Sequence, residues 1–380
     1  MAAERPIALF FDAFPAPSER FLHREAALLT GRMPIVVAAL RKVRSELLPF
    51  PVKGVWGDEC SVPDFFRSLL SGGWWVRSAS LLFRRGPRAS AFLLRRPRAF
   101  GKFASRLAGV RGVHSMHAGW CGLAAWHVAR TLGVPFTFSC HARDVFVQTS
   151  LLGFLLGEAR AALVCNEAAL EHARSRLGPL ADKLTLLRHP APPLGPLPPD
   201  PGGARLLAVG RPVPKKDYPA LFDAFRRVRE GRPDASLLVL GASEDELPPL
   251  PPGASAAGVV PFRRLRDEMR SASLLLYFSR VAPDGDRDGV PNAIVEAMAL
   301  GLPVAAADAG GVREVVRDGG TGLLVPAGDP AALAAAALRL LSEPPLRARV
   351  RTNAADLVRS LFDPDARSAE LAAFLEEHHA

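Results

Sequence analysis

Short apolar runs alternate along the chain with longer segments in which apolar residues recur at helical spacing. The first kind of run indicates buried strands, and the second indicates amphipathic helices. In the first half of the chain, strands are predicted at residues 6–11, 35–40, 112–115, 136–140 and 161–165. Helices are predicted at 21–29 and 119–132, and from residue 167 onwards.

A second alternating series follows a stretch dense in proline and glycine, residues 189–203, which favours a stiff linker. Its strands are predicted at residues 205–209, 236–240, 274–278, 304–307 and 322–325, with a helix at 218–230 and others between the later strands. The chain of 380 residues is too long for one ordinary core. Two doubly wound α/β domains are therefore expected.

The expected division places an N-terminal domain at residues 1–190, a linker at 191–203, a second domain at 204–361 and a C-terminal helix within 362–380. Ligands of doubly wound folds lie at the carboxyl ends of the strands. A ligand shared by both domains would lie in a cleft between them.

The segment 287–306 combines a predicted buried helix with two carboxylates, Asp288 and Glu296. Pro291 suits the first turn of this helix, and Gly301 suits the position just past its end. A buried carboxylate without partners is costly, so the ordinary alternative is a surface glutamate whose tip reaches water. However, Gly289 permits a close backbone approach, and a helix N-terminus suits a phosphate. The stretch favours a pocket for a molecule that carries both phosphate and hydroxyl groups.

Two other loops of the second domain could bind an anion. The strand at 205–209 leads into Gly210 and a loop with Arg211 and Lys216, a pair of cations that can neutralise a diphosphate. The Gly-Gly-Val-Arg-Glu sequence at 310–314 follows another predicted strand and starts a predicted helix, so its amides could also face an anion.

The net charge of +10 is unevenly distributed, because no Asp or Glu occurs between Asp64 and Asp144. Within this gap, residues 67–111 interleave arginines with large apolar side chains, and we call them the arginine-rich segment. Such a pattern suits a helix on an anionic membrane surface. The alternatives are a solvated basic face and a nucleic-acid contact, but no recognition module supports nucleic acid as a partner.

The four cysteines, Cys60, Cys121, Cys140 and Cys165, are scattered and lack metal-ligand spacing. They indicate reduced thiols in a cytosolic protein. The N-terminal residues do not resemble a signal peptide, and no apolar run is long enough to cross a bilayer.

Several of these motifs together resemble a known family. Gly210-Arg211-x4-Lys216, Asp288 to Glu296 with GVPNAIV between, EAMALGLPV, GGVREVV and TGLLVP resemble, in this order, the C-terminal domain of the family 4 retaining glycosyltransferases of GT-B fold. The likeness reaches the first domain at PAPSERFLHRE (15–25) and FTFSCHARDVF (136–146). The subgroup that they resemble comprises transferases of colanic acid and exopolysaccharide type.

This resemblance implies roles for residues of the second domain. Glu296 would hold the nucleotide ribose diol, and Asp288 would contact hydroxyls of the donor sugar, although the family usually has the longer Glu there. Arg211 and Lys216 would grip the diphosphate. The implied donor-binding set also includes Gly210, Gly289, Val290, Pro291 and Asn292.

For the first domain the resemblance implies that His141 lies beside the transferred sugar. Asp144 would either orient the acceptor or brace its loop, and Ser18 and Glu19 are candidates for the acceptor side. His114 and His117 are both candidates for a second histidine position.

The implied reaction retains the anomeric configuration and uses a UDP- or GDP-linked sugar as donor and a glycan or polyprenyl-linked molecule as acceptor. No metal or other cofactor is expected. The implied setting is bacterial cell-surface polysaccharide synthesis in the cytoplasm, peripheral to the inner face of the plasma membrane. By the same resemblance, a helix at 362–374 would cross back to the first domain. The alternatives are a nucleotide-sugar 2-epimerase on the same fold and a non-catalytic protein that binds sugar nucleotides.

Overall fold

The computed structural model describes residues 5–14, 16, 19–42, 54–56, 103–193 and 195–380. Two compact units are present. The first unit comprises Met1–Cys165, Ala169–Pro190 and Asp365–Ala380, and the second comprises Asn166–Ala168 and Ala191–Pro364. Most of the arginine-rich segment, and Ser18, lie outside the described residues.

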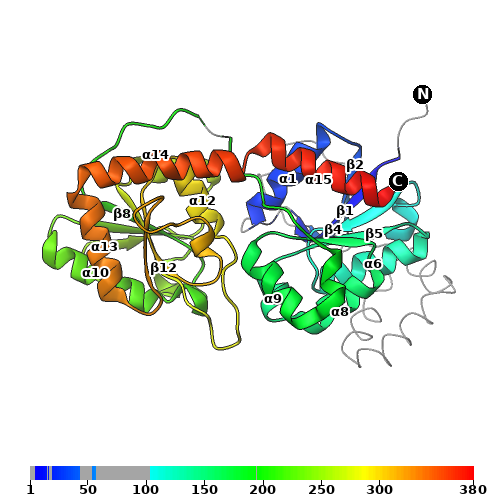
Figure 1. Cartoon of the computed structure of the whole chain (residues 1–380), viewed down its shortest axis with the longest axis horizontal. Helices are drawn as coiled ribbons and strands as arrows, with labels where there is room; N and C mark the ends of the chain where they lie inside the picture. Colours follow the sequence, from blue (N-terminus) through cyan, green and yellow to red (C-terminus); the bar gives the residue numbers. More distant parts are fainter. Residues whose placement is uncertain (1–4, 15, 17–18, 43–53, 57–102, 194) are drawn as a thin grey trace. The chain divides into compact units, whose positions relative to one another are not determined.

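The first unit is built around a parallel sheet of seven strands in its described part (Figure 1). In spatial order the strands are β3 (Gly54–Trp56), β2 (Ile35–Lys42), β1 (Ile7–Phe14), β4 (Gly112–Ser115), β5 (Phe136–Cys140), β6 (Ala161–Val164) and β7 (Leu184–Leu186). The five predicted strands are confirmed. β3 and β7 were not predicted, because three residues are too few to show a period.

Both faces of this sheet are covered by helices, and residues 7–11 of β1 are apolar without interruption. Along β1, Ala8 and Phe10 belong to one core, whereas Ile7, Leu9 and Phe11 belong to the other. This continuous run is typical of a parallel strand buried on both faces. The helices of the unit are α1 (Arg20–Thr30) and α15 (Pro364–His379) on one face, α6 (Trp120–Leu132), α8 (Thr149–Glu158) and α9 (Glu167–Leu177) on the other, with α7 (Ala142–Phe146) and the short η2 (Gly178–Lys183) between strands.

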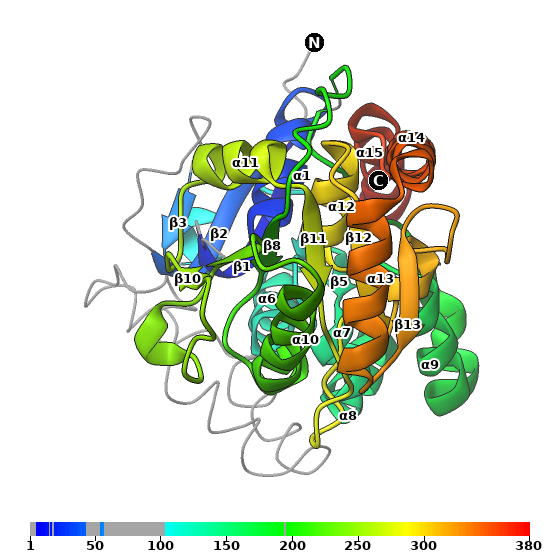
Figure 2. The same ribbon diagram turned by 90° about the vertical axis from the view of Figure 1, so that its left-hand side faces the viewer.

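The second unit repeats this plan with a parallel sheet of six described strands (Figure 2). Their order is β10 (Ala254–Ala256), β9 (Ser236–Leu240), β8 (Arg205–Val209), β11 (Leu274–Tyr277), β12 (Val304–Asp308) and β13 (Leu323–Pro326). One face packs against α10 (Tyr218–Gly231) and α13 (Pro330–Ser342), and the other against α11 (Phe262–Ser271), α12 (Asn292–Ala299) and α14 (Pro344–Leu361). Three short turns, η3 (Pro214–Lys216), η4 (Glu244–Glu246) and η5 (Val312–Glu314), lie in its loops.

In both sheets the chain reverses its direction of winding next to the first strand. The reversal falls between β1 and β4 in the first unit and between β8 and β11 in the second. Loops that follow these neighbouring strands diverge and leave room for a ligand. The fold therefore marks two loop clusters, one in each unit, as places for a site.

The helix predicted at 362–374 is present, but its predicted start is wrong. α14 ends at Leu361 and α15 begins only at Pro364, because Phe362 is buried in the core of the second unit and a proline suits a first helical turn. α15 then belongs to the first unit, where Arg111 Nη1 donates to Glu376 Oε2 at 2.8 Å and Arg32 Nε donates to Ser368 Oγ at 2.8 Å.

The proline-rich stretch is packed against the second unit. Ala191 N–H donates to Phe362 O at 2.8 Å, and Arg351 Nη2 donates to Pro198 O at 2.6 Å. Arg347 and Asp200 form an ion pair at 2.7 Å. Residues 191–193 and 195–203 are thus held along α14, which the composition alone did not predict.

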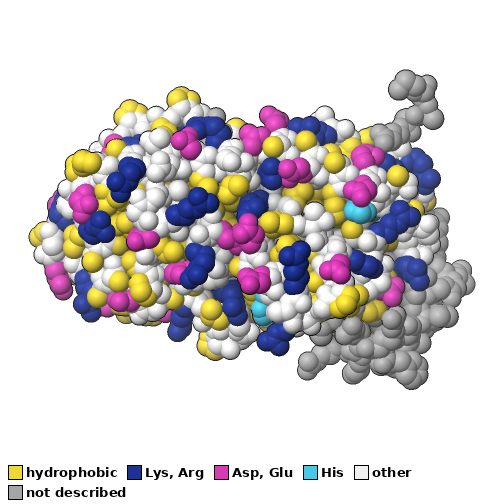
Figure 3. Space-filling model, in the orientation of Figure 1, with side chains coloured by type: hydrophobic (Ala, Val, Ile, Leu, Met, Phe, Trp, Pro, Cys, Tyr) yellow, Lys and Arg dark blue, Asp and Glu magenta, His cyan; other side chains and the backbone are white. Residues whose placement is uncertain are grey.

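The described surface mixes charges of both signs. On the face drawn in Figure 3, Lys and Arg side chains are interspersed with Asp and Glu. None of the helices that the structure describes is long and apolar enough to span a membrane.

Two buried histidines join α15 to the first sheet. His379 Nε2 lies 2.7 Å from Thr137 Oγ1, and His114 Nδ1 lies 2.8 Å from the same hydroxyl. His114 Nε2 is 3.0 Å from Ser139 Oγ. Burial lowers the pKa of His114 and of His379 to about 3 each, because a charged imidazole would be poorly solvated there.

The first unit should lose stability in mild acid. Each histidine binds a proton in the unfolded chain near its ordinary pKa but resists it when folded, so its contribution is complete above about pH 6.5 and falls as the pH drops towards about 3. At pH 5 the expected loss is about 2 kcal/mol for each histidine. All five tryptophans lie within residues 56–126, so urea unfolding followed by tryptophan fluorescence reports on this unit. His379→Gln should show a smaller loss between pH 7 and pH 5 than the wild type, and equal losses would contradict the assignment.

Candidate functional site

In the second unit, three polar side chains meet at the carboxyl ends of β8 and β11. Lys216 Nζ lies 2.8 Å from Asp288 Oδ2, and the hydroxyl of Tyr277 donates to the same oxygen at 2.6 Å. Lys216 Nζ also contacts the Tyr277 hydroxyl. Lys216 is the last residue of the short turn η3 in the loop after β8. Tyr277 is the last residue of β11, and Asp288 lies in the loop before α12. The winding reversal of the sheet brings the three together.

The group is buried, and its charges compensate each other. Burial disfavours the carboxylate of Asp288, but the charges of Lys216 and Lys215 outweigh this effect and lower its pKa. Burial lowers the pKa of Lys216, although Asp288 opposes the shift. Burial and the neighbouring carboxylate raise the pKa of Tyr277 well above its ordinary value, so it stays a neutral donor.

Lys215 adds a second cation to this group. Its Nζ lies 3.1 Å from Asp286 Oδ1 and 3.4 Å from Asp288 Oδ1. Arg211, in the same loop after β8, is exposed. Sequence reasoning named Arg211 and Lys216 but missed Lys215 and Tyr277. The adjacent lysines were visible as a pair, whereas nothing in the sequence marked Tyr277 as a partner of Asp288.

The glycine pair 310–311 shapes the loop that carries Asp288. Gly311 N–H donates to Asp288 O at 3.1 Å. A Cβ added to Gly310 would lie 2.0 Å from Asp288 O, and one added to Gly311 would lie 2.8 Å from Gly289 C. The expectation that the amides at 310–314 face an anion is therefore wrong for Gly311, whose N–H is used by the protein, and only the three-residue turn η5 follows.

Glu296 lies in the middle of α12 and is 7% exposed, so the alternative of a surface glutamate with a wet tip is wrong. Pro291 is the residue before the helix and not part of its first turn. Glu296 lines a cavity of about 120 Å³ within the second unit. The other residues around the cavity are Pro192, Pro193, Gly195, Pro196, Pro198, Phe262, Arg266, Met269, Arg270, Ala299 and Leu300.

Residues of the remaining donor set lie close to these groups. Gly210 follows β8 directly, and a Cβ there would come within 3.3 Å of the Lys216 side chain. Gly289, Val290 and Asn292 lie in or just after the loop between Asp288 and α12. Apart from Glu296, the donor-side residues predicted from the sequence thus lie in or next to the loops that follow β8 and precede α12.

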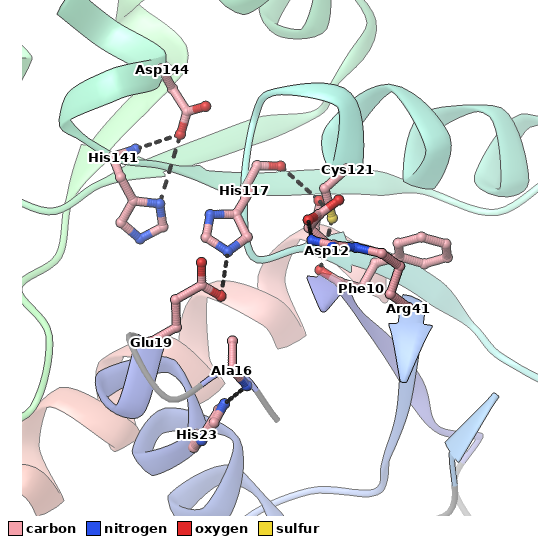
Figure 4. A network of polar contacts seen from close by, with 11 residues as sticks. Phe10, Asp12, Ala16, Glu19, His23, Arg41, His117, Cys121, His141 and Asp144 are labelled. Carbon is pink, nitrogen blue, oxygen red and sulfur yellow. Dashed lines mark hydrogen bonds and ion pairs between the residues drawn. The ribbon is translucent and has the colours of Figure 1, made fainter. Parts of the chain in front are cut away.

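In the first unit, four polar side chains form a cluster at the carboxyl ends of β4 and β5 and the start of α1 (Figure 4). His117 Nε2 lies 3.3 Å from Glu19 Oε2, and His141 Nδ1 lies 3.8 Å from Asp144 Oδ2. The rings of His117 and His141 are 5.1 Å apart. Glu19 is the residue before α1, and His141 is the residue before α7. We call Glu19, His117, His141 and Asp144 the histidine cluster.

Asp144 braces this cluster through the backbone. Its Oδ1 accepts from Gly119 N–H at 3.0 Å, and its Oδ2 accepts from His141 N–H at 2.9 Å. Burial disfavours the Asp144 carboxylate, but the hydrogen bonds and charges of His141 and His117 lower its pKa. Of the two roles considered, bracing the loop is the one that these contacts support.

His117 and Glu19 stabilise each other as an ion pair. Burial opposes the charge on both, yet their hydrogen bond lowers the pKa of Glu19 and raises that of His117. In contrast, burial lowers the pKa of His141 despite the contact with Asp144. His114, the other candidate for a second histidine position, is fully buried inside β4, so the cluster contains His117 instead.

The ring of His141 also packs against an ion pair formed by His189 and Glu25. The ring of His189 stacks on His141 with centroids 5.1 Å apart, and His189 Nδ1 lies 2.6 Å from Glu25 Oε1. Burial opposes the charge on His189, but Glu25 raises its pKa. A water-sized cavity of about 10 Å³ lies between His141, His189 and Cys165. Sequence reasoning placed His189 only at the start of the stretch dense in proline and glycine.

Comparison with known proteins gives this geometry a context. Residues 203–343 match the sequence model of the family Glycosyl transferases group 1. A phosphatidyl-myo-inositol mannosyltransferase of Mycobacterium leprae is 35% identical over 158 residues, which are 41% of this chain and 42% of that protein. The amylovoran biosynthesis glycosyltransferase AmsK of Erwinia amylovora is 33% identical over 36% of this chain and 35% of its own length. The aligned part thus spans less than half of each relative.

Solved structures resemble the chain over nearly its whole length. The Anabaena protein Alr3699/HepE, crystallised in complex with UDP-glucose, has a TM-score of 0.72 at 16% identity and covers 98% of this chain and 99% of its own. Sucrose-phosphate synthase from Thermosynechococcus elongatus has a TM-score of 0.68 at 17% identity, with coverage of 98% and 99%. These likenesses establish the expected fold, GT-B with two Rossmann-like domains. The match to the Glycosyl transferases group 1 model lies within the second unit.

Proposed function

We propose that the protein is a retaining glycosyltransferase of family 4 that moves a sugar from a nucleoside-diphosphate donor to a glycan or polyprenyl-linked acceptor. One observation carries the proposal. Asp288, paired with Lys216 at the carboxyl end of the sheet, is followed eight residues later by the buried carboxylate of Glu296, all within the Glycosyl transferases group 1 domain.

The second unit would bind the donor. Arg211, Lys215 and Lys216 supply positive charge for the diphosphate, and the start of α12 supplies its amides. Asp288, already held by Lys216 and Tyr277, would accept from sugar hydroxyls with its remaining lone pairs. Glu296 would bind the ribose diol, with the nucleoside in the cavity of about 120 Å³. The complex of Alr3699/HepE with UDP-glucose supports a UDP-linked donor, and GDP remains the alternative.

In the reaction, the bond from the anomeric carbon to the diphosphate oxygen breaks as the bond to the acceptor oxygen forms on the same face. Negative charge grows on the departing diphosphate, and Lys216 and Arg211 stabilise it. The proton of the acceptor hydroxyl passes to the departing phosphate, so the charges balance without an enzyme nucleophile. We propose that this chemistry requires no metal cofactor.

The first unit would bind the acceptor. In the pair formed by Glu19 and His117, the carboxylate can accept from a sugar hydroxyl while it keeps the imidazole in place. His141 would contact the transferred sugar, and its neutral ring can either donate or accept a hydrogen bond. Asp144 fixes the backbone at His141 and Gly119, so it positions the cluster.

The acceptor class and the setting rest on relatives and composition. AmsK and a putative colanic acid biosynthesis glycosyltransferase, WcaL of Salmonella typhimurium (35% identical over 31% of this chain and 30% of its own length), are named for exopolysaccharides. We propose bacterial cell-surface polysaccharide synthesis, with the protein cytoplasmic and peripheral at the inner face of the plasma membrane. The arginine-rich segment would bind the anionic surface, but most of it lies outside the described residues.

Replacing Glu296 should weaken donor binding and so slow transfer. In Glu296→Gln the loss of a charge-assisted hydrogen bond to the ribose should weaken donor binding about 10- to 100-fold. The measurement is nucleotide release from UDP-, GDP- and dTDP-sugars, with and without a lipid-linked glycan extract. The matched control is Glu230→Gln, an exposed glutamate of α10. Wild-type release by Glu296→Gln would contradict the assignment, and donor binding without release from any donor would favour the non-catalytic alternative.

Replacing Gly310 should weaken donor binding through the backbone. Its φ is +62° and a Cβ would collide with Asp288 O, so Gly310→Ala must displace the loop that carries Asp288. Gly319→Ala is a close control, because φ is +65° there and nothing lies within 4 Å of the added Cβ. Both variants should lose about 1 kcal/mol of stability from backbone strain. Only Gly310→Ala should also lose donor affinity, by at least about tenfold, as measured by calorimetry, and equal affinities would refute the role of the glycine.

Replacing the acceptor pair should affect the acceptor alone. His117→Gln and Glu19→Gln each remove a charged partner, which should raise the half-saturating amount of acceptor extract by about tenfold or more. Hydrolysis of the donor without acceptor should stay at the wild-type rate. Glu171→Gln, an exposed position of α9, is the control. If donor hydrolysis falls as far as transfer does, the pair does not belong to the acceptor side.

A further inference from the structure

The histidine cluster brings together the donor atoms that transition metals prefer. One atom each from His117, His141 and Asp144 lies within 4.8 Å of the others. Two imidazoles and one carboxylate form a donor set typical of Zn²⁺ and related divalent ions. The three residues come from the loop after β4 and from the start of α7, so the sheet topology, and not sequence spacing, assembles them.

The ring of His141 gives a second, independent indication of a ligand at this cluster. Both of its ring nitrogens are buried, and neither has a hydrogen-bond partner among the described residues. A buried imidazole without partners is costly, because its N–H and its lone pair both lose their contacts with water. Asp144 Oδ2 is too distant, at 3.8 Å, to satisfy the ring through a direct hydrogen bond. A bound cation between these residues would satisfy the lone pair.

The surroundings resemble the outer shell of a metal site. A histidine that binds a metal through one nitrogen usually donates its other N–H to a carboxylate. His117 has this arrangement, since its Nε2 faces Glu19 Oε2 at 3.3 Å and leaves Nδ1 for a ligand bond. The carboxylate of Asp144 is likewise held by two backbone N–H groups, at 2.9 Å and 3.0 Å. Figure 4 shows the rings of His117 and His141 side by side, with Glu19 contacting His117 and Asp144 contacting His141.

We propose that His117, His141 and Asp144 bind one divalent transition-metal ion of the Zn²⁺ class, with Glu19 orienting His117 from the outer shell. Ligand atoms around a tetrahedral Zn²⁺ lie about 3.4 Å apart. Side-chain rotations that move each ligand atom by about 1 Å would bring the three atoms to this separation. Three protein ligands leave a fourth position open to water or to an anion.

The ion is an inhibitor and not a cofactor of the proposed reaction. It occupies a nitrogen of His141, which would otherwise contact the transferred sugar, and a nitrogen of His117, which belongs to the pair that would bind the acceptor. This part of the inference rests on the proposed function, whereas the binding of the metal does not.

The test is a titration of the full chain, freed of metal by a chelator, with Co²⁺ alone. A tetrahedral Co²⁺ site absorbs visible light, so occupancy is read without any enzyme activity. One Co²⁺ should bind each chain and be displaced by Zn²⁺. His117→Gln and Asp144→Asn should weaken binding at least tenfold, and Glu19→Gln about tenfold, as expected for loss of an outer-shell partner. Asp144→Asn also removes a brace, so circular dichroism must confirm that it folds, and His117→Gln is the decisive variant.

His172→Gln is the matched control, because His172 is a half-buried histidine of the same unit whose ring packs on Phe146. It should bind Co²⁺ like the wild type. Absence of a visible band in the wild type, unchanged affinity in His117→Gln, or an equal loss in His172→Gln would each overturn the site.

The inhibitory role has its own readout. Zn²⁺ should slow nucleotide release by the wild type, and a chelator should restore it. If Co²⁺ binds as expected but no donor releases nucleotide, the metal site stands and the proposed function falls. If Zn²⁺ occupies the site without slowing release, the inhibitory role is wrong.

Discussion

The dominant constraint on this protein is that both of its parallel sheets are covered by helices on both faces. Side chains of the central strands are therefore mostly apolar in either direction, as the two cores on opposite sides of β1 show. Polar side chains inside these strands, such as His114 and Thr137, contact each other, and the charged side chains of both loop clusters lie where strands end. The winding reversal of each sheet separates the loops at one such edge, so the chemistry of each unit is concentrated there.

The two loop clusters solve the problem of buried charge in the same way. Lys216 shares Asp288 with Tyr277 in one, and His117 is paired with Glu19 in the other. A buried ion without a partner would cost several kcal/mol, so each charge is matched by an opposite charge or by a backbone donor. These pairs keep the groups ionised in the absence of a ligand. A ligand that binds here meets groups that are already oriented, which lowers the entropy lost on binding.

The predictions from the sequence failed where a strand was too short to show a hydrophobic period, or where one residue type has two possible roles. β3, β7 and β10 have three residues each, too few for a hydrophobic period to show. The break between α14 and α15 was not predicted, because Phe362 is apolar and fits the helical pattern. It is in fact buried in the core of the second unit, and the next helix starts only at Pro364. The glycine pair at 310–311 was assigned to an anion, yet its main role is to let two backbone segments touch. Glycine permits either use, and only the neighbouring chain distinguishes them.

The sequence by itself determined the two-domain α/β architecture, because hydrophobic period is a local property that can be recognised without coordinates. It also singled out Asp288 and Glu296, through their motif, as candidates for a binding site. Only the tertiary structure decided which histidine accompanies His141. His114 and His117 are three positions apart in the sequence. His114 lies within strand β4 and is buried, whereas His117 lies in the loop after this strand and contacts Glu19. The structure also brought Tyr277 to Asp288 and Glu19 to His117, since contacts between distant segments depend on strand order and register, which no local pattern records.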